Sequence, residues 1–179
     1  MKNKLFPIIF IFALCSSIVS EAQTNRSYKK GYRGMVELEN YATFGKDKVG
    51  GLFQISTTHG YSLGNGVFIG AGIGCGYGIA SDQYLVSAFI DSKYTLFDTT
   101  VSPFVSARTG FCLGTERNNL FGQMVSISFG IDVNRLSVKI GYQYCPMKEQ
   151  VVLDGVARQS TTTVFTKLNQ VFCTFAFNF

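Results

Sequence analysis

Apolar and polar residues alternate along most of the chain from residue 33 onward, in segments of about ten residues separated by turn residues. A two-residue period is typical of β-strands, because successive side chains point to opposite faces of a sheet. In the clearest segment, residues 67–78, the odd positions are apolar or aromatic and the even positions after Phe68 are all glycine. The period predicts eight strands, over residues 33–44, 51–60, 67–78, 84–94, 101–114, 124–133, 136–144 and 164–179.

The connections between these segments alternate in length. Tight turns follow the second, fourth and sixth strands, at residues 62–66, 97–100 and 134–135, whereas the other connections include the longer segments 115–122 and 145–163. Short turns at one rim and longer loops at the other are typical of transmembrane β-barrels. We therefore expect both chain ends at the rim that carries the short turns.

The two faces of the expected strands differ in polarity. One face is a continuous band of Val, Ile, Leu, Phe and Tyr, while the other carries glycine, serine and charges of both signs. The candidate interior charges are Glu37, Glu39, Asp91, Lys93, Arg108, Asp132 and Lys139. A soluble barrel would bury the apolar face and leave the glycine row without a role, whereas lipid can cover an apolar face. The pattern predicts an all-β, eight-stranded antiparallel transmembrane up-and-down barrel with a polar, side-chain-filled interior.

Turn lengths place interior charges near one another. A two-residue turn at 134–135 sets Lys139 diagonal to Asp132, and a four-residue turn at 97–100 sets Asp91 diagonal to Arg108. Because an unpaired buried charge costs several kcal/mol, we expect Arg108 to meet Asp91 and one or both glutamates of the first strand. The glycine row would leave room for Arg108 and for bulky side chains arriving from across the interior.

The composition and the N-terminal residues indicate where in the cell the protein is located. Only 15% of the residues are charged, against about 25% in typical soluble domains. Residues 1–22 have the basic end, apolar stretch and small residues before a cleavage site that a secretory signal peptide requires. Cleavage after Ala22 would leave residues 23–32 as an N-terminal periplasmic segment and residues 33–179 as the barrel. The remaining charge is too mild and scattered for a nucleic-acid partner.

Four cysteines follow the leader, and an exported chain can pair cysteines as disulfides. Cys75 and Cys173 share one face of the expected strands, whereas Cys112 lies on the other, and Cys145 begins the longest loop. Their spacing contains no CxxC motif and no Cys/His pair suited to a metal. We interpret all four as small apolar side chains.

Catalytic chemistry has little support in the sequence. The only histidine is His59, near the rim of the short turns, with Ser56 and Ser62 as its nearest serines and no acidic partner in register. No phosphate-binding loop or nucleophile motif is present. We therefore expect no enzymatic activity, no cofactor and no metal.

The last strand ends on alternating aromatic residues, Phe175, Phe177 and Phe179. This ending resembles the C-terminal signature of bacterial outer-membrane barrels, which the outer-membrane barrel assembly machinery recognises. With its leader and eight strands, the chain is similar to the outer membrane protein β-barrel domain family of small OmpX and OmpA-type barrels. The resemblance implies an outer-membrane location, contact with outer-membrane lipid, help from periplasmic chaperones and a monomeric state, and it carries over no catalytic residue.

The width of an eight-stranded barrel bears on function, because its interior is just wide enough to be filled by side chains. We therefore expect a structural or surface-interaction protein that presents extracellular loops. A small porin-like channel is the alternative, since the glycine row could leave the lumen under-filled. A membrane lipid-modifying enzyme is the third hypothesis.

Overall fold

The computed structural model describes residues 28–44, 49–79, 83–114, 121–153 and 160–179. The expected signal peptide and residues 115–120 of an expected loop lie outside this part of the chain. The eight strands are β1 (Gly31–Phe44), β2 (Val49–Ser62), β3 (Val67–Gly78), β4 (Gln83–Thr95), β5 (Val101–Gly114), β6 (Phe121–Val133), β7 (Leu136–Leu153) and β8 (Ser160–Asn178). Across the described ranges, no helix has both the length and the apolarity needed to cross a membrane.

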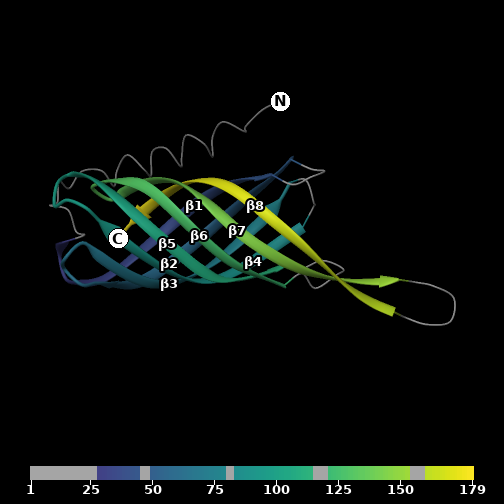
Figure 1. Ribbon diagram of the computed structural model, residues 1–179. Coiled ribbons are helices and arrows are strands. Elements are labelled where there is room, and N and C mark those ends of the chain that lie inside the picture. The colour runs from purple at the N-terminus through teal and green to yellow at the C-terminus, as the bar shows by residue number, and fades with distance from the viewer. Residues whose placement is uncertain (1–27, 45–48, 80–82, 115–120, 154–159) are drawn as a thin grey trace, which may run out of the picture.

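The strands form one closed barrel in sequence order (Figure 1). Each strand pairs antiparallel with the next, and β8 returns to β1 through pairs that run from Met35 opposite Asn178 to Phe44 opposite Asn169. Closure satisfies the backbone groups of both edges, which a strand spanning hydrocarbon requires. The predicted eight-stranded antiparallel barrel is confirmed.

Side chains alternate across the barrel wall as the sequence predicts. Outward residues such as Ile73, Phe129 and Ile140 are 63%, 60% and 59% exposed. Inward residues such as Glu37 and Glu39 are 0% exposed. Since no water-soluble protein leaves so large an apolar band uncovered, the wall is built to face lipid and the polar interior is confirmed.

The two ends of the barrel differ. The short turns, the start of β1 and the C-terminus share one end, while a hairpin of β7 and β8 projects from the other (Figure 1). The prediction of a loop over residues 145–163 was wrong for most of its length, because the two strands stay paired out to Leu153 opposite Ser160. The β-branched residues of this segment, including Val151, Val152 and residues 161–164, favour a strand over a loop.

The β4–β5 connection is wider than a four-residue turn. Thr95 pairs with Phe104, so Asp91 lies directly opposite Arg108 and not diagonal to it. The hydroxyl of Ser102 donates to the carbonyl oxygens of Phe97 and Thr99 at 2.6 and 2.8 Å, which holds the wider turn. The predicted register was therefore wrong by two residues, yet it placed both charges on the same face.

The glycine row on β3 makes room for side chains, as expected. These side chains come from β3 itself and from the adjacent strands, and not from across the lumen. A Cβ on Gly72 would lie 2.5 Å from the ring of Phe89, its partner on β4, and one on Gly70 would lie 2.7 Å from the ring of Phe68. The two aromatic rings therefore occupy the space beside bare backbone. Arg108 gains its space indirectly, because its guanidinium carbon lies 3.9 Å from the centre of the Phe89 ring.

Gly72→Ala should destabilise the refolded barrel by about 1–3 kcal/mol, because the new methyl group meets the Phe89 ring and the carbonyl oxygen of Thr57. The matched control is Ala71→Val, which adds bulk on the lipid-facing side of the same strand and should change stability by about 0.5 kcal/mol or less. Urea unfolding in detergent measures both. Equal stability of the two variants would contradict this packing.

Candidate functional site

An ion cluster occupies the middle of the lumen, and we call it the inner ion cluster. Arg108 on β5 is its centre: Nη1 donates to Oε1 of Glu39 at 2.6 Å, Nη2 donates to Oδ2 of Asp91 at 2.8 Å, and Nη2 also bonds Glu37. Lys139 on β7 donates to Oε1 of Glu37 at 2.6 Å and lies 3.8 Å from Asp91. Five residues from four strands are thus joined across the barrel.

Neutral polar side chains complete the bonding of Glu39. Ser56 donates to its Oε1 at 2.8 Å, Gln54 donates to its Oε2 at 3.2 Å, and the hydroxyl of Tyr41 also donates to Oε2. A buried carboxylate is tolerated when its lone pairs are occupied in this way. The cluster is therefore held by hydrogen bonds from β1 and β2 as well as by opposite charge.

A second ion pair lies beside the cluster. Lys93 on β4 donates to Oδ1 of Asp132 on β6 at 2.6 Å, and Ser137 donates to the same oxygen at 2.5 Å. The ammonium of Lys93 also lies 3.9 Å from the centre of the Phe104 ring. The turn geometry set Lys139 diagonal to Asp132, but Lys139 bonds Glu37 instead, and Asp132 is bonded by Lys93, which lies two strands away on β4.

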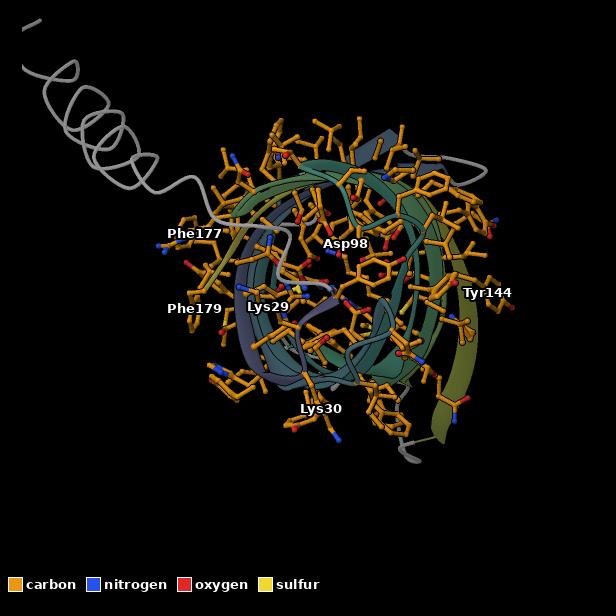
Figure 2. All side chains as sticks on the ribbon, turned by 90° about the vertical axis from the view of Figure 1, so that its left-hand side faces the viewer. Lys29, Lys30, Asp98, Tyr144, Phe177 and Phe179 are labelled. Carbon is orange, nitrogen blue, oxygen red and sulfur yellow. The ribbon has the colours of Figure 1, made fainter. Side chains whose placement is uncertain are left out.

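All seven interior charges named from the sequence lie inside the barrel and are at least 93% buried. Figure 2 looks into the end of the barrel that carries the short turns and the C-terminus, where Lys29, Lys30 and Asp98 lie, and shows the interior crowded with side chains. The cavity beside Glu37 and Lys93 measures about 10 Å³, which is room for about one water molecule. Oδ1 of Asp91, which accepts no hydrogen bond from the described residues, lines the same region.

This arrangement closes the lumen and occupies the carboxylates. Each acid of the inner ion cluster already faces a guanidinium or an ammonium, so it is not free to take up a cation. An ion crossing the barrel would have to separate charges that are out of contact with bulk water. The site is suited to holding the wall together and to blocking passage.

Sequence reasoning missed a polar cluster on the outer wall near the chain termini. His59 lies between Thr57, whose Oγ1 is 3.1 Å from its Nε2, and Tyr32, whose hydroxyl oxygen is 2.5 Å from its Nδ1. The terminal ring of Phe179 meets the imidazole edge-on with 6.0 Å between ring centres. Tyr32 belongs to the strand next to that of His59, so only the β1–β2 register, which sets Gly34 opposite His59, could have revealed the contact.

The same wall carries a recess of about 940 Å³, with Thr57 and His59 among its lining residues. Small side chains at Ala71 and Ala88 and bare backbone at Gly72 let the wall dip there. The recess faces the surroundings of the barrel, because its lining belongs mainly to the outward positions. It is a place where lipid chains can lie close to the backbone.

The C-terminal aromatics lie at the rim of the short turns. Figure 2 shows Phe177 and Phe179 side by side there, and Phe175 and Phe179 are 56% and 42% exposed. Phe179 exchanges both backbone hydrogen bonds with Gly34, and its ring covers that glycine, where a Cβ would be 2.4 Å away. The last residue therefore contributes to the seam between β8 and β1.

The comparisons with known proteins agree on architecture. No family model matches the chain, and no curated protein matches it. Among solved structures, Neisserial surface protein A is 12% identical, with 83% of this chain and 97% of that chain covered and a TM-score of 0.54. The outer membrane enzyme PagL is 12% identical, with coverage of 80% and 98% and a TM-score of 0.57.

A de novo designed transmembrane β-barrel is 15% identical, with 82% of this chain and 95% of that chain covered and a TM-score of 0.50. Identities of this size establish the fold alone. Together with the closed sheet, its apolar exterior and its polar interior, they show that the chain has the fold of a transmembrane β-barrel.

Proposed function

We propose that the protein is an integral outer-membrane β-barrel with a structural or surface-interaction role, which it performs through the loops at the rim opposite the chain termini. The observation that carries this proposal is the closed lumen: the inner ion cluster fills it, and the adjoining cavity of about 10 Å³ is too small for solute passage. A rigid closed barrel is suited to displaying loops. Among the described residues, the paired ends of β7 and β8 project farthest beyond the barrel and are available for contact (Figure 1).

The proposed location follows from the wall and the N-terminus together. The apolar outer band matches outer-membrane lipid, and the signal peptide over residues 1–22 would direct export, leaving residues 23–32 in the periplasm. Periplasmic chaperones and the barrel assembly machinery are the proposed partners during biogenesis. The mature barrel would then work as a monomer without a cofactor.

An epitope tag inserted at Gly155, which lies outside the described residues in the connection between β7 and β8, should be detectable by antibody on intact cells. The orientation places the chain termini and short turns in the periplasm, as in other transmembrane barrels. A tag inserted at Asn65 in the β2–β3 turn is the control and should be detected only after permeabilisation. The reverse pattern would overturn the orientation.

A small channel is less well supported, because passage would require the inner ion cluster to open. Arg108→Ala leaves Glu37, Glu39 and Asp91 with Lys139 as their nearest remaining cation, and should destabilise the refolded barrel by about 3–5 kcal/mol. Removing the plug should also raise conductance in planar bilayers above the closed level of the unchanged protein.

The control for that variant is Lys30→Ala, which removes an exposed charge at the rim and should shift stability by about 0.5 kcal/mol or less. Full stability and unchanged conductance in Arg108→Ala would exclude the cluster as the closing element. High conductance of the unchanged protein would favour the channel.

The outer cluster supports a lipid-modifying enzyme as a second candidate. Thr57, His59 and Tyr32 offer a hydroxyl, a base and an orienting group next to a lipid-facing recess. However, acyl transfer needs hydrogen-bond donors for the oxyanion that forms. The backbone N–H groups of β1, β2 and β3 bond to neighbouring strands and are not available for that purpose. Fatty acid release from phospholipid vesicles, lost in His59→Ala, would favour the enzyme.

Phe179→Ala should reduce the amount of folded protein in the outer membrane while leaving the stability of the refolded barrel nearly unchanged. The substitution keeps both backbone bonds to Gly34 and removes a ring that is 42% exposed, but it removes the terminal aromatic of the assembly signal. Phe129→Ala, which removes another lipid-facing ring, is the control and should keep normal cellular levels. Equal levels of the two variants would contradict a role in assembly.

A further inference from the structure

Two of the four cysteines meet inside the barrel. Cys112 on β5 and Cys145 on β7 are both 1% exposed, and their sulfur atoms are 2.9 Å apart. Cys75 and Cys173 instead lie on the outer face. All four cysteines are free thiols in the structure, and this pair differs from the other two in that its sulfur atoms are in contact.

The contact is unusual because β5 and β7 are not neighbours. With β6 between them, their backbones would be about 10 Å apart in a flat sheet, since adjacent strands are about 4.8 Å apart. Inward side chains converge in a narrow closed barrel, and the β6 residue that lies beside both sulfurs is Gly122. A Cβ at Gly122 would lie 3.0 Å from the sulfur of Cys112 and 3.1 Å from that of Cys145.

The pair also lies where the barrel wall ends. On β8, only residues from Asn169 onward pair with β1. Asn169 pairs with Tyr144 on β7, and Cys145 is the next residue, just outside the closed wall. From there the β7–β8 hairpin leaves the closed wall. A covalent link at this position would fix the base of the hairpin to β5.

We propose that Cys112 and Cys145 form a disulfide bond when the protein is exported, joining β5 to β7 across Gly122. The proposal rests on the proposed function, because export to the outer membrane takes the chain through the oxidising periplasm. The sulfurs must approach by less than about 1 Å to reach bonding distance, which draws the two strands together over a glycine that offers no side chain to resist.

The oxidant is a disulfide, either of a thiol oxidoreductase or of a small thiol compound. One cysteine, as its thiolate, attacks the oxidant and forms a mixed disulfide, releasing one thiol. The second cysteine then attacks the protein sulfur of that mixed disulfide, forms the Cys112–Cys145 bond and releases the second thiol. The protein loses two hydrogen atoms and the oxidant gains them. Because both sulfurs are buried in the finished barrel, the exchange belongs before closure.

The test uses the full mature chain refolded into detergent with glutathione disulfide present during folding. The intact mass of the folded protein should be about 2 Da below that of the fully reduced chain, and alkylation after unfolding without reductant should block only two of the four cysteines. Digestion without reductant should yield a linked peptide pair containing Cys112 and Cys145. Cys112→Ala and Cys145→Ala should each abolish the linked pair. Cys75→Ala, which changes a lipid-facing cysteine, should keep it.

Gly122→Val is a second test that leaves every thiol in place. Its side chain would collide with both sulfurs and displace them, so the yield of linked peptide should fall at least severalfold in barrels that still migrate as folded on unboiled gels. Folded barrel whose four cysteines all react with the alkylating agent once the chain is unfolded without reductant would overturn the disulfide, as would a pair that gains the mass of a bound metal. A chain that never forms a barrel would instead count against the proposed function.

Discussion

Arg108 is buried in the barrel, where water cannot compensate its charge, so carboxylates of the protein must do so. The rest of the barrel is arranged around that requirement. Its guanidinium bonds carboxylates from β1 and β4, and Lys139 from β7 bonds one of the same carboxylates. Because the partners lie on strands far apart around the wall, the bonds form only when the barrel is closed. Removing one partner would leave charges without compensation in a medium where that is costly.

This constraint explains features that look unfavourable one by one. Glycine weakens a strand, yet Gly70 and Gly72 provide the space that the Phe68 and Phe89 rings occupy, and the Phe89 ring in turn contacts the guanidinium of Arg108. The apolar wall outside excludes water from the same region. Lipid contact, aromatic packing and the inner ion cluster are therefore parts of one arrangement, in which the lumen is filled rather than open.

The period of the sequence was sufficient to assign strands and faces, because a barrel wall between lipid and a polar core leaves each side chain one suitable side. Details that depend on how strands align were harder to predict. The β4–β5 register shifted by two residues because Ser102 widens the turn. The sequence predicts a loop beyond Tyr144, whereas β7 and β8 stay paired there past the closed barrel wall.

Contacts between particular side chains were the least predictable. Asp132 is bonded by Lys93 and not by Lys139, and two cysteines are in contact beside Gly122. Both contacts depend on how deeply side chains reach into a narrow lumen. Neither has a local sequence signal.

The most direct test of the account is to measure which face of the wall contacts lipid. The chain contains no tryptophan, so a tryptophan introduced at one position is the only source of tryptophan fluorescence. Ile73→Trp places a single tryptophan on the outer face, and Phe89→Trp places one on the inner face, at matching depth because Ile73 pairs with Ala88. In vesicles of brominated phospholipid, fluorescence of the Ile73→Trp protein should be strongly quenched and that of the Phe89→Trp protein should be nearly unaffected. Quenching in the opposite order would contradict a polar interior closed by Arg108.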